Sequence, residues 1–431
     1  MYDRWSSRMT PEEMVVSGKD RDILRRLGAR LAEIAADPVM DELRDLWRRL
    51  NALAAERPMI LTETFAVAKD GDEMREVIPQ ECEGEWARVI ERALRDKILH
   101  FEFVGDDAVV EPRITYETVV ESSGYGLEET YEYGQGEHGR GSYVWEPPIR
   151  NLAEELPRLS RRSYRVNEEW TARKRELLEH VFDGILPVAN RNNFWWTQGM
   201  TWTAIKLVGL EPFMLAMHDQ PEALHALMVL LRDDHLHTLD WHERHGLLTL
   251  NNEDDYVGSG GGAYTDLLPQ PDCVPGQPAR VKDLWGLSES QETVGVSPAM
   301  FGEFIFPYQL PVIARFGLAC YGCCEPIDKR WEYVRQIQNL RRVSVSPWSD
   351  VAVMAENLGL NYVFSRKPSP ALVSADWNED RILSDLRETI TVTKGLNVEI
   401  VLKDVHTVRG EPWRFRRWVE LARRAIDEVY H

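Results

Sequence analysis

The chain has 431 residues, of which 43% are apolar, and a net charge of −20 that results from 51 Lys and Arg against 71 Asp and Glu. This length and apolar content allow a sizeable core, and no uncharged apolar run is long enough to span a membrane, so we expect a soluble globular protein. The acidic surface would repel phosphate backbones, which argues against nucleic acid as a partner. The first residues lack the apolar core of a signal peptide, and the five cysteines are too few and too clustered for a disulfide framework. Both observations favour the reducing cytoplasm.

The first third of the chain is predicted to be mainly helical and then β-like. Apolar residues recur at steps of three and four through about residue 57, which predicts an N-terminal helical layer. A strand is expected at 58–65 and a helix at 86–99. The pattern from 98 to 120 is typical of strands, with Asp106 and Asp107 at a hairpin turn.

Residues 124–141 are rich in glycine, acidic residues and tyrosine and show no periodicity. We expect an irregular loop there that folds over a site or lies against a second subunit of a homodimer.

From about residue 165, short apolar strands alternate with amphipathic helices, and each connection is long enough for a right-handed crossover. We therefore predict an α/β fold, a (β/α)8 (TIM) barrel over residues 96–431, with a helical extension at 1–95. No glycine-rich nucleotide-binding motif follows a strand. The expected strands are 185–189, 247–250, 284–292, 317–321, 343–346, 362–365 and 398–402.

In a barrel of parallel strands, the loops after the strands form the active-site face, and the loop after strand 317–321 has the most distinctive chemistry. Three of the five cysteines lie there within five residues, followed by Glu325. Cys320 lies in the strand and is expected to be buried, and only one of Cys323 and Cys324 should face a site because adjacent side chains diverge. Sulfur beside a carboxylate suits zinc. The alternative is that these cysteines are simply buried apolar residues.

His406 follows the last predicted strand and is the second candidate metal ligand. Cys323 and His406 could share one ion across the barrel mouth, with Glu325 or Glu253 supplying oxygen, whereas the alternative for His406 is a structural imidazole. Other strand ends and loops supply the candidate catalytic residues Glu253, Lys403 and Asp404, and the candidate substrate-binding residues Asn190, Asn192, Trp195, Trp196, Gln291 and Lys367.

Two further patterns are assigned to non-catalytic roles. The histidines at 235, 237, 242 and 245 lie on an acid-rich helix at spacings that do not match a zinc helix, so we expect them to be solvated. The glycine run at 258–262 is expected to be a mobile lid or a turn, since no Lys-Ser/Thr follows it as in a phosphate-binding loop.

The stretch from 185 to 431 resembles the uroporphyrinogen decarboxylase superfamily of (β/α)8 barrels. The resemblance is carried by the sequences at 321–326, 339–348, 365–368 and 403–407. One branch contains metal-free porphyrinogen decarboxylases, whose N-terminal arginine-rich motif is missing from residues 1–130 here. The other contains zinc methyltransferases with a His-x-Cys element and a later ligand. Cys323 matches that cysteine and His406 the later ligand, but Tyr321 stands where the histidine would be.

The resemblance implies a zinc-dependent methyltransferase in which Cys323, His406 and Glu325 hold the ion. It further implies a small methyl donor, an O-methyl aromatic compound if Trp195 and Trp196 stack against it, and a corrinoid protein as the methyl acceptor. The alternatives are a metal-free lyase that acts on a carboxylated substrate, and a non-catalytic member of the family.

Overall fold

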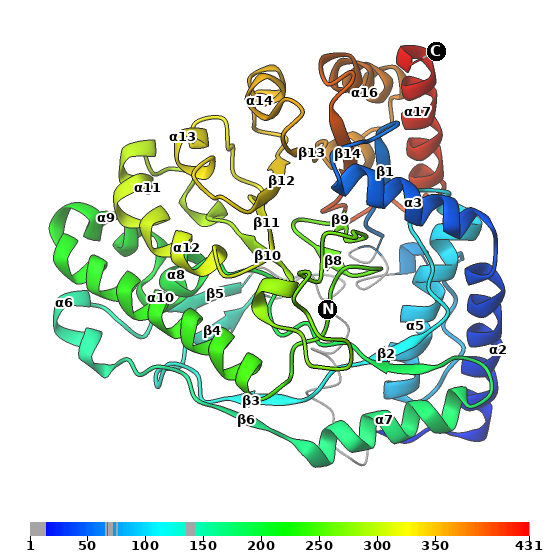
Figure 1. Cartoon of the computed structure of the whole chain (residues 1–431), viewed down its shortest axis with the longest axis horizontal. Coiled ribbons are helices and arrows are strands. Elements are labelled where there is room, and N and C mark those ends of the chain that lie inside the picture. The colour runs from blue at the N-terminus through cyan, green and yellow to red at the C-terminus, as the bar shows by residue number, and fades with distance from the viewer. Residues whose placement is uncertain (1–13, 65–66, 68–71, 75, 135–142, 431) are drawn as a thin grey trace.

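The computed structural model describes residues 14–64, 67, 72–74, 76–134 and 143–430 (Figure 1). Its central element is a six-stranded sheet in the order β1-β14-β13-β12-β11-β10, and every neighbouring pair is parallel. Parallel neighbours require crossover connections, which the intervening helices provide. The strands are β1 (Met59–Thr62), β10 (Trp285–Ser288), β11 (Leu318–Tyr321), β12 (Leu340–Val345), β13 (Val363–Arg366) and β14 (Asn397–Leu402).

The remaining strands form two-stranded sheets. One parallel pair, β2 (Ile114–Tyr116) with β7 (Val188–Asn190), lies apart from the large sheet (Figure 1). Three pairs are antiparallel: β3 (Val120–Ser122) with β6 (Tyr164–Val166), β4 (Thr130–Tyr133) with β5 (Tyr143–Glu146), and β8 (Tyr256–Val257) with β9 (Gly261–Gly262).

Five of the described helices begin at a residue whose side chain caps the first turn. Ser17, Asn167, Ser297, Asp350 and Asn378 each accept a hydrogen bond from a backbone N–H of the first helical turn, which satisfies a group that the helix leaves unpaired. The α-helices are α2 (Gly18–Ala35), α3 (Val39–Asn51), α5 (Glu85–Leu99), α6 (Leu152–Glu155), α7 (Glu168–Phe182), α8 (Thr201–Val208), α9 (Leu210–Asp219), α10 (Pro221–Arg244), α11 (Pro298–Phe304), α12 (Phe306–Ile313), α13 (Trp331–Val334), α14 (Val351–Leu358), α15 (Ala371–Ser374), α16 (Glu379–Val392) and α17 (Trp413–Tyr430).

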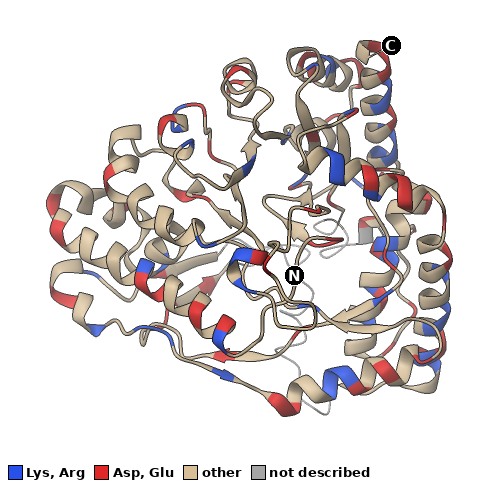
Figure 2. Ribbon diagram, in the orientation of Figure 1, with Lys and Arg blue, Asp and Glu red and all other residues tan. Residues whose placement is uncertain are grey.

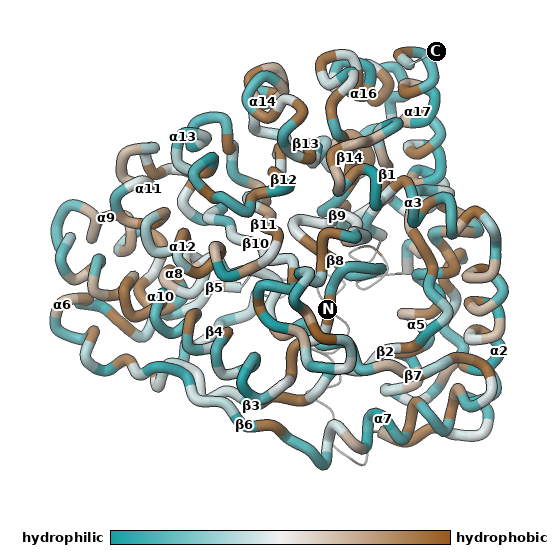
Figure 3. The backbone as a smooth tube through the Cα atoms, viewed as in Figure 1, coloured by the Kyte–Doolittle hydropathy of each residue, from teal (hydrophilic) through white to brown (hydrophobic). Residues whose placement is uncertain are grey.

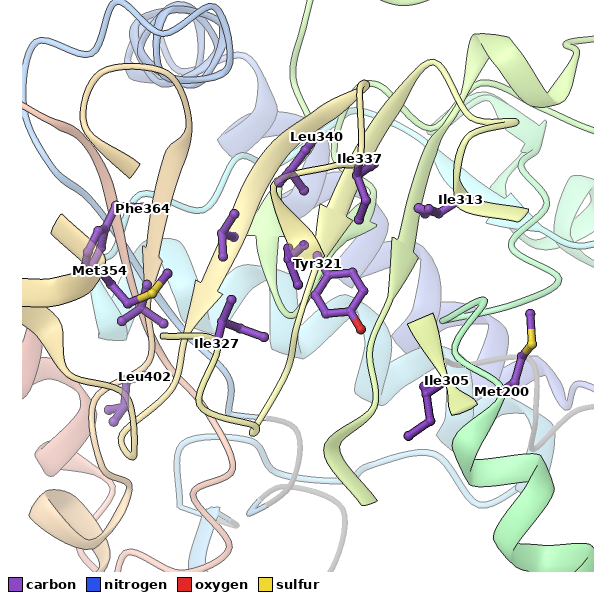
Figure 4. Close-up of a cluster of buried hydrophobic side chains, with 14 of the residues drawn as sticks. Met200, Ile305, Ile313, Tyr321, Ile327, Ile337, Leu340, Met354, Phe364 and Leu402 are labelled. Carbon is purple, nitrogen blue, oxygen red and sulfur yellow. The ribbon is translucent and has the colours of Figure 1, made fainter. Parts of the chain in front are cut away.

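The main apolar core lies between the large sheet and the helices outside it, along which hydrophobic and hydrophilic residues alternate (Figure 3). Tyr321 lies in this outer core among Ile305, Ile327 and other apolar side chains (Figure 4). Its hydroxyl donates to Gln309 Oε1 at 2.8 Å. Its strand neighbour Cys320 belongs instead to a separate apolar cluster with Trp285. Successive residues of a strand face opposite sides, so Tyr321 faces the helices and Cys320 the other face of the sheet.

Charged side chains of both signs are spread over α2, α7 and α17 (Figure 2). This distribution is typical of helices with one face in solvent. Among the described residues, no helix is long and apolar enough to cross a membrane.

Three predicted elements were wrong. The expected hairpin around residue 106 is replaced by a π-helix at His100–Val104 that ends at Gly105 in a left-handed conformation, φ 74°. Residues 247–250, expected to be a strand, belong to none of the described sheets. Instead, Asn192 donates through its side-chain amide to Leu247 O, and the Asn251 side chain bonds both N and O of Trp285. The amphipathic helix expected between strands 317–321 and 343–346 is only the four-residue α13, and β12 already begins at Leu340.

The α/β class with a parallel sheet is confirmed. Closure of the two parallel sheets into one (β/α)8 barrel stays a prediction, as does the division at residues 95 and 96. Strand β1, from the first of those segments, is an edge strand of the large sheet, where it pairs with β14.

Candidate functional site

The glycine run 258–262 forms the buried turn of the β8–β9 hairpin and not an exposed loop. Of the two expectations, a mobile lid or a turn, the structure shows a turn. The hairpin packs against the inner side of the large sheet. A Cβ atom on Gly261 would lie 2.5 Å from the Arg342 guanidinium and from Glu399 Oε1, and one on Gly260 would lie 2.6 Å from Glu63 Oε1. Only glycine allows the backbone to approach these side chains so closely.

A chain of hydrogen bonds joins this hairpin to three strand ends. Ser259 Oγ donates to Cys323 Sγ at 3.3 Å and accepts from Lys403 Nζ at 3.0 Å. Lys403 Nζ lies 3.4 Å from the Tyr256 hydroxyl, which donates to Glu63 Oε1 at 2.8 Å. Glu63, Cys323 and Lys403 follow β1, β11 and β14 directly or by one residue, so the large sheet fixes their positions. All of the five except the half-buried Tyr256 are buried.

The charges of this cluster depend on one another. Burial lowers the pKa of Lys403, but Glu63 and Cys323 outweigh that effect and raise the pKa, so this side chain remains an ammonium ion at neutral pH. Burial raises the pKa of Glu63, and the attraction of Lys403 offsets only part of the rise. The site therefore holds a buried cation next to a buried carboxyl group whose pKa is raised.

A second lysine lies at the end of β13, where Lys367 Nζ donates to Ser365 Oγ, which in turn donates to Glu399. Burial lowers the pKa of Lys367 to about 8; Glu399 opposes this effect, and Lys403 adds to it. Glu399 also forms a buried ion pair with Arg342, with Nε 3.2 Å from Oε1.

Two buried carboxyl groups follow β10 and β11. Both Glu325 oxygens accept backbone N–H donors, from Ser290 at 2.8 Å and from Cys323 at 2.9 Å. Burial raises the pKa of Glu325, and burial together with Glu292 and Glu325 raises that of Glu289 well above 4.5. Glu289 Oε1 has no hydrogen-bond partner. A carboxyl group with a raised pKa is more readily protonated, and in its protonated form it can donate a proton.

The three predicted zinc ligands do not form a ligand group. Cys323 and Glu325 are buried, whereas His406 is exposed, and two strands separate β11 from β14 in the sheet. Glu325 already accepts backbone N–H groups at both oxygens, and Tyr321, at the family's histidine position, faces the outer core. Within the described ranges, no three His, Cys, Asp or Glu side chains are arranged to hold a metal ion. The residues present therefore do not fit the zinc ion that the resemblance implies.

Several predicted polar residues have structural partners on the β2–β7 side. The Asn190 amide donates to Tyr116 O and lies against Asn192, which accepts from the backbone of Thr118. Glu253 forms ion pairs with Arg113 at 2.6 Å and Arg191 at 3.1 Å. These side chains connect neighbouring segments.

The remaining predicted residues are dispersed. Trp195 packs edge-on against His242 and Phe316, while Trp196 packs, half-buried, against the apolar cluster that contains Cys320. Gln291 is half-buried, and Asp404 is exposed with a left-handed backbone, φ 58°. No contact joins either residue to the hydrogen-bonded chain, although the Asp404 charge contributes to the pKa of Lys403.

The expectation of solvated histidines on α10 was wrong for two of the four. His235 and His242 are buried, His235 Nδ1 lies 2.8 Å from Gln198 Oε1, and His242 Nδ1 lies 2.8 Å from Thr238 O. Burial lowers the pKa of each to about 4, so both are neutral at physiological pH. Helix α10 packs against several neighbours, and histidines on its inward faces are therefore buried.

Sequence reasoning missed Glu63, Tyr256 and Ser259. Glu63 follows the first strand and could have been found by the same strand-end argument. Arg342 and Glu399, which are charged residues within largely apolar strands, could also have indicated a buried polar site. A buried charge requires a partner, so such residues predict that polar side chains meet inside the sheet.

No protein-family model matches this sequence, and a search of curated proteins finds no similar sequence. Among solved structures, the fold is similar to that of a methyltransferase from Methanosarcina mazei, with a TM-score of 0.50 and 13% sequence identity over 90% of this chain and 98% of that one. At this identity the similarity concerns the fold alone.

Proposed function

We propose that this protein is a methyltransferase whose reacting centre is the hydrogen-bonded group Cys323, Ser259, Lys403, Tyr256 and Glu63. The observation that carries the proposal is the convergence of a thiol, a buried ammonium ion and a carboxyl group at the ends of parallel strands, where enzymes of this architecture place their catalytic groups. The fold similarity to a methyltransferase supports the same class of reaction.

The proposed donor is a small O-methyl aromatic compound, and the proposed acceptor is a corrinoid protein. When the methyl group leaves an ether, the oxygen retains the bonding electrons and needs a proton. Lys403 is the group on this chain that can donate it, and Glu63, with Nζ 3.9 Å from Oε1, helps to keep Lys403 protonated beforehand. Trp196 packs against the cluster that contains the hairpin residue Val257, so an aromatic ring stacked on Trp196 would lie next to the hairpin.

Zinc has no part in this mechanism because the predicted ligands do not come together. Metal analysis of the purified protein and of the variants Cys323→Ala and His406→Ala tests this point. If the unsubstituted protein contains zinc and both variants lose it, the ligand set that the resemblance implies would be correct.

The lyase alternative is less well supported. An enzyme that acts on a carboxylated ring needs arginines that are free to bind carboxylates. Arg191 pairs with Asp255 and Glu253, and Arg366 is buried and donates to Ser346 O. These two arginines, which follow strands β7 and β13 or end them, thus have partners within the protein.

The test is to incubate the protein with methoxylated aromatic compounds and reduced cobalamin as a stand-in acceptor, and to measure phenol release and methylcobalamin formation. We expect Lys403→Met to lower the rate by about 10²-fold or more, the usual range for loss of a general acid. Cys273→Ser, at a half-buried cysteine outside this group, should retain the activity. Absence of methyl transfer from every donor, or full activity of Lys403→Met, would contradict the proposal.

A further inference from the structure

The loop after β11 places two thiols side by side. All five cysteines are free, and Cys323 Sγ lies 3.7 Å from Cys324 Sγ. The two differ in exposure: Cys323 is 5% exposed, whereas Cys324 is half-buried and can be reached from solvent. We propose that Cys323 and Cys324 form a reversible redox pair that closes to a disulfide between adjacent residues. This inference does not depend on the proposed methyl transfer.

The backbone of the loop holds the pair in this arrangement. Gly322 turns the chain out of β11 with φ 92°, a conformation that L-residues with side chains rarely adopt. The backbone of Cys323 is then fixed on both sides, since its N–H donates to Glu325 Oε2 at 2.9 Å and its carbonyl accepts from Ser344 Oγ at 3.0 Å. Cys323 is thus held in place, and the Cys324 side chain must supply most of the movement that brings the sulfurs from 3.7 Å to a bonded distance.

The resulting disulfide should be easy to reduce. Cα atoms of adjacent residues are about 3.8 Å apart. Disulfides usually join Cα atoms about 4.4 to 6.8 Å apart, and departures from that range strain the bond and make it more reducible. Strain of this kind favours a reversible switch over a structural crosslink.

The oxidant that we propose is a low-molecular-weight disulfide, RSSR. The accessible Cys324 thiolate attacks one sulfur of RSSR, which releases the first RS⁻ and leaves a mixed disulfide on Cys324. Cys323 then attacks the Cys324 sulfur and releases the second RS⁻. The two protons of the protein thiols end on the two RSH molecules, and the pair has given two electrons to RSSR.

Oxidation would also change the group around Ser259. The Ser259 hydroxyl donates to Cys323 Sγ, and Lys403 donates to the same hydroxyl. A Cys323 sulfur bonded to Cys324 is a weaker acceptor than a thiol or thiolate, so the link between the loop and Lys403 weakens. The redox state of the pair is therefore communicated to the hairpin.

The experiment exposes the full-length protein to oxidised glutathione and follows intact mass and the mass of the peptide that contains residues 323 and 324. We expect a loss of about 2 Da, the two hydrogens removed, confined to that peptide and reversed by a dithiol reductant. Cys273→Ser should behave like the unsubstituted protein. Cys323→Ser should stop at the mixed disulfide on Cys324, with bound glutathione, and Cys324→Ser should show neither product.

Stable glutathione on Cys324 of the unsubstituted protein would overturn the proposal, as would a 2 Da loss that persists in Cys324→Ser. Because the readout is mass and not methyl transfer, failure of this proposal and failure of the proposed function can be told apart. The two single variants also carry different predicted products, so a folding defect in one does not remove the test.

Discussion

The ends of the large sheet and the ends of the β2–β7 pair both carry charged side chains, but the two regions satisfy them differently. Around β2 and β7, Arg113 and Arg191 pair with Glu253, Asp254 and Asp255. Burial alone would raise the pKa of Asp254, yet Lys97 and Arg113 lower it to about 2, so the Asp254 charge is well compensated. Burial raises the pKa of the neighbouring Asp255, and Arg191 offsets only part of that rise.

At the ends of the large sheet, the charges are buried and only partly compensated. Lys367 and Lys403 lie on neighbouring strands, and two carboxyl groups after β10 and β11 have raised pKa values. Perturbed pKa values of this kind gather at functional sites. The comparison shows that buried lysines with perturbed pKa values lie at the ends of the large sheet, where we placed the proposed reacting centre.

The largest effect is expected from breaking the buried ion pair between Arg342 and Glu399 on the inner side of the large sheet. Arg342→Met leaves the Glu399 carboxylate buried without its ion-pair partner, and we expect a loss of about 3 to 5 kcal/mol of unfolding free energy. Denaturant unfolding measures it. The double variant Arg342→Met/Glu399→Met should recover much of the lost unfolding free energy, because no unpaired charge stays buried. If the double variant is as destabilised as Arg342→Met, the packing of the Arg342 side chain and not its charge accounts for the effect.

The next effect is a pH dependence at the end of β1. Burial lowers the pKa of His100, but Asp106, at 2.9 Å from Nδ1, outweighs it and raises the pKa from 6.5 to about 9. Because the pKa of His100 is higher in the folded than in the unfolded state, protonation of His100 stabilises the fold. This stabilisation of about 3 kcal/mol is fully present below pH 6.5 and is lost as the pH rises through about 9. Lys367, with a pKa of about 8, titrates in the same window and acts in the opposite direction, so the His100 contribution is the difference between the pH profiles of the unsubstituted protein and His100→Asn. That difference in unfolding free energy should amount to about 3 kcal/mol across the window.

A smaller effect is expected from the hairpin that covers the reactive groups. Gly260→Ala adds a Cβ next to Glu63 and Val401 at φ 103°, and we expect a cost of about 2 to 3 kcal/mol. Gly395→Ala is the matched control, because Gly395 also has a positive φ but no atom within 4 Å of its Cβ position. Its cost should be about 1 kcal/mol, from backbone strain alone. Equal costs at the two positions would show that the hairpin is not tightly packed.

The smallest effect is expected on the β2–β7 side. Glu253 is 41% exposed at its side chain, and Arg113 and Arg191 keep Asp254 and Asp255 as partners without it. Glu253→Gln should therefore cost less than about 1 kcal/mol. If Glu253 were catalytic, as the sequence suggested, Glu253→Gln would lower the activity of the protein far more than its unfolding free energy. Measuring both quantities on the same variant distinguishes the two roles.

The sequence by itself determined the α/β class, most strands and helices, and two members of the proposed reacting centre. Apolar periodicity and capping residues such as Ser297 report local backbone conformation, and the strand-end rule identified Cys323 and Lys403. Local patterns failed where side chains replaced a backbone ladder, as at residues 247–250.

Only the tertiary structure decided which groups meet. Tyr256 and Glu63 are 193 residues apart, and Lys403 and Ser259 are 144 apart, so no local pattern could join them. It likewise placed His235 in the interior and His406 in solvent, and it turned the glycine run inward against Arg342 and Glu399. The physical reason is that periodicity fixes which face of an element is apolar, whereas the packing of whole elements fixes which polar side chains converge.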